Sequence, residues 1–496
     1  MNSSTVFFDD TQLGTYRSWW LDLRFWSDTR PTQTMDETST RSSGGTCSEL
    51  AAAARGFFAR GATRPIEYRL AALARLEKAI SLETDSILAA LTSDLGKPDL
   101  EAWLAEVHFV LTEIRLFRRN LRRWAKPRRV GNPFFVWPAR SEIRREPFGA
   151  VLIAAPWNYP FQLSLSPLVA AVAGGNTVVL KPSELAPATA ALLERLVGNV
   201  FETGHVAVIT GGPETGAALL EETFAFYFYT GSESVGRLYG AAAARHLAPA
   251  VLELGGKCPC ILDETADFDL AVPRIVAAKW FNAGQTCIAP DFVLVPEARR
   301  EEFVETLRAR LQTSYGTGVP RDLAAIGSRA HFERILGRVS CEVLVIGEDD
   351  PESRRLAPRL LPRADWDDPA MREEIFGPIL PVIGYDSLDE VLNVLSTRPA
   401  PLALYAFSKD SVVLEKIAAA VSSGSVCFND AVKQALNLEL PFGGVGASGM
   451  GRYRGRAGFE TFTWTRAVTR RYWVKDVFLT LPPYGQKVEW MRRWMK

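Results

Sequence analysis

The stretch VLIAAPWNYPFQLSLSPLVAAVAGGNTVVLKPSE, residues 151–184, holds two short apolar runs separated by a longer apolar segment. Residues 151–155 and 176–180 have the length of buried strands, and the segment after Pro160 has the length of a helix. Strand, helix and strand in this order predict a parallel βαβ unit, in which the second strand ends at Lys181-Pro182.

The same alternation continues outward from this unit. We expect a helix over 187–200, strands over 206–210 and 224–229, and a further helix that begins at Gly231-Ser232. A second alternating region runs from about 255 to 430, with apolar strands near 292–295, 343–346 and 380–383. Together they predict an α/β fold with two lobes.

Three flanking segments differ in character. Residues 1–48 read as a leader and linker, because 32–48 are rich in Ser, Thr and Gly. Apolar spacing over 49–125 is helical, with a break at Lys97-Pro98. Prolines and glycines punctuate 126–149, which predicts an exposed hairpin.

Composition excludes several classes of protein. The 496 residues are 47% apolar and 23% charged, which is typical of a globular enzyme of two or three domains. Lys+Arg and Asp+Glu number 57 each, so no overall field attracts nucleic acid or an anionic membrane. Six scattered cysteines favour a reducing compartment. With no apolar run of about 18 residues and no targeting segment, we expect a cytoplasmic protein.

Metal chemistry has little support. The four histidines are isolated from one another, and Cys258-Pro259-Cys260 lacks the two-residue gap of a zinc loop. We therefore expect no metal site and interpret the Cys-Pro-Cys segment as a strand edge.

Cys287 is the candidate nucleophile. It follows the small and polar residues 281–286, FNAGQT, and precedes an apolar run. A reactive thiol needs a lowered pKa or a neighbouring base. The alternative is a buried, inert cysteine.

Glu253 is the candidate general base. It lies at the end of an apolar segment. Leu254 follows it, and then Gly255-Gly256-Lys257. Burial should raise the pKa of its carboxyl toward the range of a general base. The alternative is an ion pair with Lys257.

Asn158 lies in the turn APWNYP, residues 155–160, directly after a predicted strand. On this proline-bracketed turn its amide can donate to a developing oxyanion. The alternative is an asparagine that serves only the turn.

Two segments suit a nucleotide. Residues 230–236, TGSESVG, follow an apolar strand and open a helix, so backbone N–H groups are available to a pyrophosphate. Lys181 and Glu184 end another strand, where they could bind ribose hydroxyls. The alternatives are a simple serine N-cap at Ser232 and a solvated strand end.

Taken in order, these motifs resemble one family, the NAD(P)-dependent aldehyde dehydrogenases, over residues 49–485. The motifs are Pro156-Trp157-Asn158, Lys181-Pro182-Ser183-Glu184, Gly231-Ser232 with Gly236, Glu253 to Lys257, Gly284 to Cys287, Glu374 to Pro378 and Pro441 to Gly444. The phrases at 287–291, CIAPD, and 448–451, SGMG, resemble the class 3 branch, which includes fatty aldehyde dehydrogenases.

The resemblance implies a mechanism. Cys287 would attack the aldehyde carbon to give a thiohemiacetal, whose oxyanion Asn158 and the Cys287 backbone N–H would hold. Hydride would pass to the nicotinamide of NAD or NADP and leave a thioester. Glu253 would activate the water that releases the carboxylic acid. Positions matching the family's cofactor contacts are Trp157, Lys181, Glu184, Gly231, Ser232, Gly236, Glu374 and Phe376.

It also implies an organisation. We expect a Rossmann-like cofactor domain over 49–125 and 146–253, an α/β catalytic domain over 254–430, and a bridging β-arm over 126–145 and 431–481 that makes a homodimer. Residues 482–496 predict an amphipathic helix, similar to the one over the substrate funnel of fatty aldehyde dehydrogenases. It would touch the membrane peripherally or pack on the partner subunit.

One departure affects the substrate. Class 3 members often carry histidines shortly before Pro-Phe-Gly-Gly, whereas this chain has KQALNLE at 433–439. A less polar channel at Leu438 suits a medium- or long-chain, apolar or aromatic aldehyde. Alternatives are a CoA-acylating or reductive semialdehyde-type dehydrogenase, which needs no water-activating Glu253, and a non-catalytic oligomeric scaffold.

Overall fold

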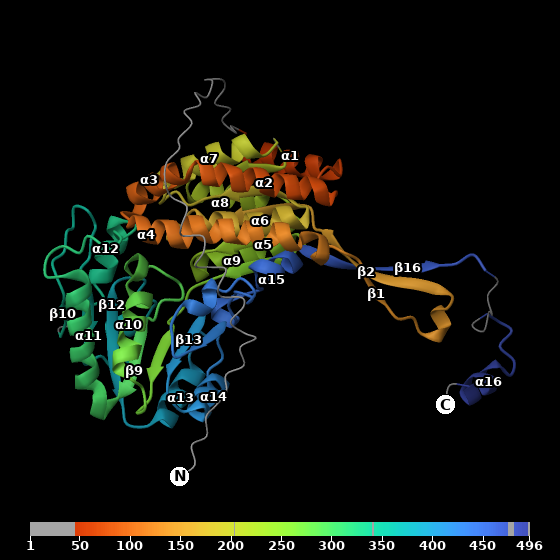
Figure 1. Cartoon of the computed structure of the whole chain (residues 1–496). Coiled ribbons are helices and arrows are strands. Elements are labelled where there is room, and N and C mark those ends of the chain that lie inside the picture. Colours follow the sequence, from red (N-terminus) through yellow and green to blue (C-terminus); the bar gives the residue numbers. More distant parts are fainter. Residues whose placement is uncertain (1–44, 203, 340–341, 475–480, 495–496) are drawn as a thin grey trace, which may run out of the picture. The chain divides into compact units, whose positions relative to one another are not determined.

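The computed structural model describes residues 45–202, 204–339, 342–474 and 481–494. Most of the predicted leader, residues 1–48, lies outside the described residues. Residues from Ser42 onward form one unit of contacts. The α/β fold class is confirmed, and the βαβ unit of residues 151–184 is its centre (Figure 1).

The first sheet has six strands in the order β15-β7-β6-β3-β4-β5, all parallel except β15. Its strands are β3 (Ala150–Ala154), β4 (Thr177–Lys181), β5 (Val206–Val208), β6 (Phe226–Thr230), β7 (Ala250–Glu253) and β15 (Gly449–Met450). Its helices are α6 (Gln162–Gly174), α7 (Pro187–Val200), α8 (Pro213–Glu221) and α9 (Glu233–Arg245). The strands from β3 to β7 are parallel because a helix connects each of them to the next along the chain.

A helical layer precedes this sheet in the sequence, as the spacing over 49–125 predicts. It contains α1 (Cys47–Ala59), α2 (Ile66–Leu82), α3 (Thr84–Leu95), α4 (Asp99–Ala102) and α5 (Phe109–Trp124). Between α4 and α5 the chain makes a π-helical turn, η4 (Trp103–His108). This turn carries the buried Glu106, and π-turns of this kind are frequent beside functional sites.

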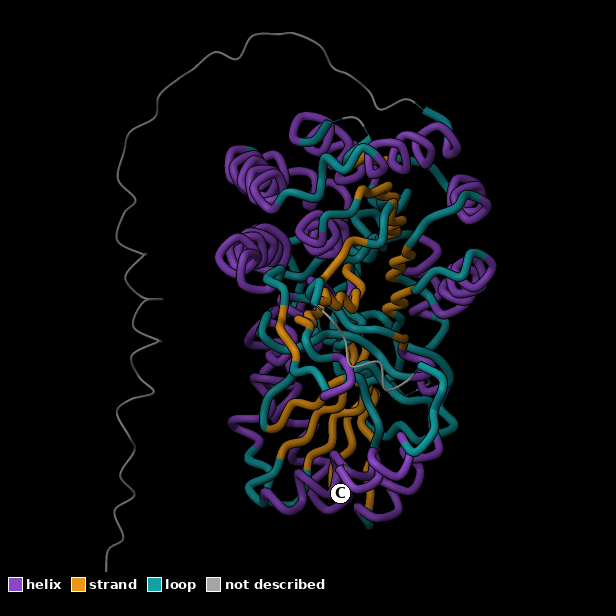
Figure 2. The backbone as a smooth tube through the Cα atoms, turned by 90° about the vertical axis from the view of Figure 1, so that its right-hand side faces the viewer, coloured by secondary structure: helices purple, strands orange, loops and turns teal. Residues whose placement is uncertain are grey.

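The second sheet has seven strands in the order β10-β11-β12-β9-β8-β13-β14, parallel except for β10. They are β8 (Pro259–Leu262), β9 (Phe292–Pro296), β10 (Leu344–Val345), β11 (Arg359–Leu361), β12 (Ile379–Tyr385), β13 (Ala403–Phe407) and β14 (Ser425–Phe428). Its helices are α10 (Phe268–Lys279), α11 (Arg300–Tyr315), α12 (Arg329–Leu336), α13 (Leu388–Thr397) and α14 (Ser411–Ala420). Figure 2 shows the strands of both sheets between helices.

The Cys-Pro-Cys segment is not at the edge of this sheet. Cys258 precedes β8 and Cys260 lies within it, between β9 and β13, and both thiols are fully buried. The segment thus lies at the beginning of the strand β8, as expected, and that strand is a central one in its sheet.

A third sheet joins β1 (Arg128–Val130), β2 (Ala139–Pro147) and β16 (Thr463–Arg471), all antiparallel. The predicted hairpin is thus confirmed, and β16 pairs with all nine residues of β2. The helix α15 (Gly455–Thr461) precedes β16, and α16 (Lys487–Trp494) is the helix predicted near the carboxyl end. Within the described ranges, no helix has the length and apolarity to cross a membrane.

Candidate active site

A cavity of about 900 Å³ lies where the carboxyl ends of the first sheet's strands face loops of the second. Segments that follow β3, β6 and β7 contribute Trp157, Asn158, Gly231, Ser232 and Glu253. The second sheet's half contributes Cys287, Glu374 and Phe376. Ligand sites in open α/β sheets form at this end of the strands.

Cys287 reaches the cavity through an unusual turn. The preceding 3-10 turn η6 (Phe281–Gly284) contains three consecutive residues with positive φ: Asn282 and Ala283 at 53° and Gly284 at 74°. Left-handed residues other than glycine cost about 1 kcal/mol each, so surrounding contacts must hold this turn. The Cys287 thiol is not in a disulfide bond, and the residue as a whole is only partly buried.

The pKa of the Cys287 thiol is raised to about 12, first by burial and then by the charges of Glu374 and Glu253. A reactive thiol needs either a lowered pKa or a neighbouring base. Without bound ligand, Cys287 does not have the lowered pKa. The alternative of an inert core cysteine is not supported either, because the thiol's residue lines the cavity.

Glu253 is the last residue of β7 and is 3% exposed. Among the described residues, neither of its carboxylate oxygens has a hydrogen-bond partner. Burial raises the pKa of this carboxyl well above its usual range. Lys257 forms its ion pair with Asp291 instead. The alternative of an ion pair between Glu253 and Lys257 is thus wrong. The interpretation of Glu253 as a general base stays a prediction.

Asn158 is buried beside the Cys287 loop. Its side-chain Nδ2 donates to the backbone oxygen of Gln285 at 2.9 Å, which uses one of its two amide hydrogens. Its backbone oxygen accepts from Lys97 Nζ at 2.8 Å and from Asn282 Nδ2 at 3.0 Å. The side chain thus ties the turn to the nucleophile loop and keeps one N–H for another acceptor.

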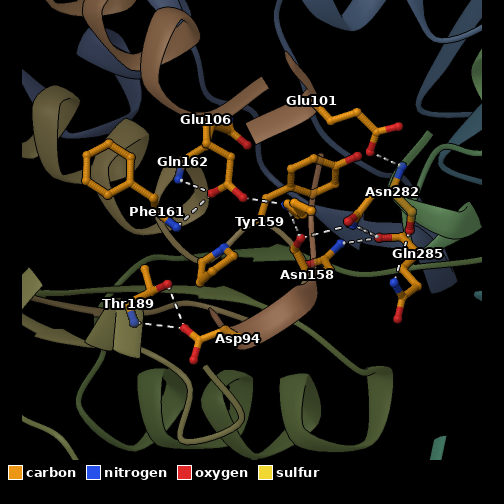
Figure 3. A network of polar contacts seen from close by, with 12 residues as sticks. Asp94, Glu101, Glu106, Asn158, Tyr159, Phe161, Gln162, Thr189, Asn282 and Gln285 are labelled. Atoms are coloured by element: carbon orange, nitrogen blue, oxygen red, sulfur yellow. Dashed lines mark hydrogen bonds and ion pairs between the residues drawn. The ribbon is translucent and has the colours of Figure 1, made fainter. Parts of the chain in front are cut away.

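Four buried residues, Lys97, Glu106, Asn282 and Gln285, form what we call the support network. Figure 3 labels Glu106, Asn282 and Gln285 around Asn158. Lys97 and Glu106 form an ion pair with side chains no more than 1% exposed. Glu106 Oε2 accepts from the backbone N–H groups of Phe161 and Gln162 at 2.9 and 3.1 Å. The Lys97–Glu106 pair of the network therefore holds in place the turn that carries Asn158.

The other half of the support network holds the Cys287 loop. Gln285 Nε2 donates to the backbone oxygens of Asn282 and Ala325, and Gln285 Oε1 accepts from Gly327 N at 2.8 Å. These side-chain hydrogen bonds hold the strained left-handed turn in place. Sequence reasoning missed this network, since Lys97 was visible only as a helix break.

The start of α9 offers backbone donors to the cavity. Ser232 occupies the N-cap position but its side chain makes no capping bond, so the simple N-cap alternative is wrong. A Cβ on Gly231 would come within 2.3 Å of Tyr229 Oη, which explains the glycine. Gly236 does not line the cavity; it lets α9 approach Leu254, whose Cδ2 lies 2.6 Å from where its Cβ would be.

Lys181 and Glu184 are paired with each other, Nζ to Oε2 at 3.0 Å. The Lys181 side chain is 9% exposed and that of Glu184 is 39% exposed, so this strand end is solvated only in part. Neither residue lines the cavity; Lys181 is the last residue of β4, and Glu184 lies three residues beyond it. Their contact with a nucleotide therefore stays a prediction.

Glu374 and Phe376 lie on a loop that α12 holds in place. His331 Nε2 is 2.8 Å from the backbone oxygen of Phe376, which has a positive φ of 55°. Arg334 donates to the backbone oxygen of Ile375 at 2.6 Å. Burial and Asp291 raise the pKa of Glu374 to about 8. His331 and Arg334 also line the cavity and were missed, because nothing local marks a histidine that binds a distant carbonyl.

Residues around the cavity fit a dinucleotide. Backbone N–H groups at the start of α9 are uncapped, and Thr230 Oγ1 is buried without a partner among the described residues. At Gly255 a Cβ would lie 2.0 Å from Glu374 Oε2, so only glycine allows this carboxylate to approach the strand end. Donors, an unused hydroxyl and a glycine-lined approach are what a pyrophosphate and ribose require. The carboxylate of Glu233 is paired with Arg237 rather than aimed at this site.

Comparisons with known proteins agree with this geometry. The model of the aldehyde dehydrogenase family matches residues 31–468. The 4,4'-diaponeurosporen-aldehyde dehydrogenase of Staphylococcus aureus is 40% identical over 89% of this chain and 97% of its own. Aldehyde dehydrogenase family 3 member B1 of Rattus norvegicus is 42% identical over 87% of this chain and 94% of its own.

Solved structures give the same result. A substrate-bound structure of Staphylococcus aureus AldH superposes with a TM-score of 0.88 at 39% identity, covering 90% of this chain and 99% of that one. PnpE in complex with nicotinamide adenine dinucleotide gives a TM-score of 0.78 at 25% identity, covering 86% of this chain and 90% of that one.

Proposed function

The chain belongs to the aldehyde dehydrogenase family of NAD(P)-dependent oxidoreductases, and on this premise we propose that it oxidises an aldehyde to the carboxylic acid through a covalent bond to Cys287. The observation that carries the proposal is the convergence of Cys287, Glu253 and Asn158 on one cavity. Fold alone would not support a specific chemistry, whereas these three side chains do.

Attack by the Cys287 sulfur on the aldehyde carbon forms the thiohemiacetal. Because the pKa of the thiol is about 12, its proton passes to a water molecule in the cavity as the sulfur–carbon bond forms. The positive charge of Arg454 and the thiol's own backbone N–H both act to lower this pKa. The new oxyanion is held by the second N–H of Asn158 Nδ2 and the Cys287 backbone N–H.

When bound, the nicotinamide cofactor accepts the hydride of the thiohemiacetal. Its pyrophosphate fits the start of α9 at Gly231 and Ser232, and the loop of Glu374 and Phe376, beside Trp157, fits its nicotinamide side. Lys181 and Glu184 would open their mutual ion pair to bind ribose hydroxyls. The complex of PnpE with nicotinamide adenine dinucleotide supports this assignment.

Glu253 then removes a proton from the water that attacks the thioester and releases the acid. Its raised pKa makes the ionised carboxylate a strong base, and both oxygens are unpaired among the described residues; the carboxyl must therefore lose its own proton before it activates the water. A CoA-acylating dehydrogenase would have no use for this carboxyl, so hydrolysis is favoured over transfer to another acceptor.

For the substrate we propose a medium- or long-chain aldehyde with an apolar or aromatic body. Three apolar residues on the segment before Gly443 are buried, namely Ala435, Leu438 and Phe442, and this supports an apolar path for the substrate. The Staphylococcus relative named for a diaponeurosporen aldehyde supports the same class.

We further propose a homodimer through the arm of β1, β2 and β16, and a cytoplasmic location with peripheral membrane contact. The described part of α16 supports the contact: Val488 and Trp490 are 54% and 49% exposed, and Arg492 and Arg493 supply positive charge. Deleting 486–496 should weaken activity on long-chain aldehydes and binding to anionic vesicles. Equal loss on short aldehydes would favour packing on the partner subunit.

The proposed activity is tested by mixing the purified enzyme with NAD or NADP and straight-chain aldehydes of graded length. We expect reduced cofactor and an equal amount of carboxylic acid, with kcat/KM rising with chain length. A product that requires added CoA, or no cofactor reduction with any aldehyde, would reject it.

A further inference from the structure

A second cavity, of about 220 Å³, lies beside the last segments of the second sheet. Val426, Leu440, Pro441 and Phe442 make its wall largely apolar. Arg454 is its single charged lining residue within the described part of the chain. The established family activity assigns nothing to this cavity.

Arg454 is buried, with 7% of its surface exposed. Its guanidinium lies over the rings of Phe442 and Phe109, 4.0 and 4.8 Å from their centroids, and one nitrogen donates to the backbone oxygen of Ala435. Its Nε has no hydrogen-bond partner among the described residues. Aromatic faces attract a cation but accept no N–H bond in the plane of the guanidinium.

No carboxylate among the described residues lies within 4.0 Å of Arg454. Its charge acts on two buried carboxyls, Glu113 and Glu253, yet burial raises the pKa of both and favours their neutral forms. Arg454 is therefore a buried cation with no carboxylate in salt-bridge contact among the described residues. Such a group is costly unless an anion completes it.

The cavity also lies within reach of Cys287 chemistry. Met450 of β15 pairs with Leu252, next to Glu253, and Arg454 follows four residues later. The Arg454 charge acts on the Cys287 thiol and on Glu253, so the cavity's charged group lies within electrostatic range of both reacting residues. Gln434 Oε1, which also lacks a donor among the described residues, leaves room for one water beside such a group.

We propose that this cavity binds a carboxylate carried on an apolar chain, and that the preferred substrate is an aldehyde whose far end is that carboxylate. The carboxylate accepts hydrogen bonds from the Arg454 guanidinium while the chain packs on Phe442 and Leu440. The inference rests on the proposed aldehyde oxidation for its second half only; the binding half stands without turnover.

The substrate half is tested with two aldehydes of equal length, octanal and suberate semialdehyde. Wild-type enzyme should have the higher kcat/KM for the semialdehyde. In Arg454→Met the ratio of the two kcat/KM values should fall by about 30-fold or more, the usual loss for one partner of a buried charged pair. A ratio compares the aldehydes in one enzyme, so a general loss of activity cancels.

Arg456→Met is the matched control. Arg456 is two residues away, exposed on α15 and paired with Glu460, and it does not line the cavity. This variant should keep the wild-type ratio. An equal fall in both variants, or an unchanged ratio in Arg454→Met, would overturn the substrate half.

The binding half is tested by calorimetric titration of octanoate into the enzyme without cofactor. Wild type and Arg456→Met should bind octanoate, and Arg454→Met should bind it at least about tenfold more weakly. Octanoate binding that depends on Arg454, with an unchanged aldehyde ratio, would mean that the cavity takes the acid product and not the substrate. Equal binding by all three enzymes would reject the cavity as a carboxylate site.

If Arg454→Met fails to fold in a thermal unfolding experiment, Leu440→Trp replaces it, since Leu440 lines the cavity and is 47% exposed. The larger ring should fill the cavity and lower both octanoate affinity and the aldehyde ratio. An enzyme that binds octanoate through this cavity but oxidises no aldehyde would reject the proposed function and leave the binding half standing.

Discussion

Two sets of buried polar side chains serve the cavity of Cys287, and they differ in how their atoms are used. In the support network, Lys97, Glu106 and Gln285 are hydrogen-bonded through every side-chain oxygen and nitrogen, and among the described residues Asn282 Oδ1 is the one network atom without a partner. In the reacting pair, both oxygens of Glu253 lack partners among the described residues, and the pKa of Cys287 is raised to about 12.

The difference separates positioning from reaction. A satisfied buried network gives a unique geometry, since any other arrangement leaves a polar atom unpaired. An unsatisfied buried carboxyl costs stability and gains basicity. We therefore expect changes in the support network to act mainly on folding, and changes in the reacting pair to act mainly on rate.

The largest effect is expected for Cys287→Ala, which should abolish dehydrogenase activity while leaving cofactor binding intact. No other free thiol of the described residues lines the cavity. Activity is measured as cofactor reduction and cofactor affinity by titration. Cys427→Ala, a half-buried thiol on β14, should keep its turnover; near-normal turnover in Cys287→Ala would break the comparison at its centre.

Glu253→Gln should lower steady-state turnover by about 10² to 10⁴, the usual loss of a general base. Hydride transfer precedes the step that needs this base, so we expect a burst of reduced cofactor near one per site, with acyl-enzyme visible by mass spectrometry. A slowed burst would show that Glu253 removes the thiol proton instead.

Lys97→Met should reduce the free energy of unfolding by about 3–5 kcal/mol, because it leaves the Glu106 carboxylate buried and unpaired. Glu253→Gln should not destabilise the fold. The folded-state pKa of Glu253 is raised, so its ionisation favours unfolding as pH rises above the unfolded value, and Gln removes that cost. Chemical denaturation near neutral pH compares them. Equal destabilisation would end the distinction between the two sets.

Asn158→Ala should cost about 10² to 10³ in rate, as for one oxyanion donor. Asn158 combines positioning and reaction, since one N–H of its amide holds the loop through Gln285 and the other is proposed to reach the substrate. We expect kcat to fall more than the affinity for aldehyde. A loss below about threefold would remove Asn158 from the oxyanion site.

The smallest effect concerns pH. Without cofactor, alkylation of Cys287 by iodoacetamide should rise about tenfold per pH unit from neutral pH upward, because only the thiolate reacts. The thiol pKa of about 12 places any plateau at the alkaline limit. Cys427→Ser removes a competing thiol from the measurement. A plateau near neutral pH would mean that the resting thiol is already activated.

The sequence predicted the reacting pair better than the support network. Apolar runs bounded by glycine and proline gave the strands, and the helix expected over 187–200 is α7 (Pro187–Val200). Glu253 could be predicted because a strand end followed by glycines is a local pattern, and burial then follows from the parallel sheet.

The support network has no such local pattern. Lys97 and the backbone oxygen of Asn158 are 61 residues apart, and the long-range pairing appears only in three dimensions. A weak signal did exist: Glu106, Val110 and Glu113 share one helical face with Phe117, and both acids are fully buried. An acid on an apolar face predicts a partner, but not which one.

Because of the π-helical turn η4, the helix from Asp99 to Trp124 tolerates the deletion of a residue at some positions and not at others. Removing a residue from α5 would rotate one flank by about 100° against the other. A π-turn is an α-helix that carries one inserted residue. Deleting a residue within Trp103–His108 would therefore restore a regular helix and leave both flanks facing as before. Such a chain would keep the facing of both flanks but move Glu106 away from Lys97, Phe161 and Gln162, so the cost of the deletion would fall on the buried support network.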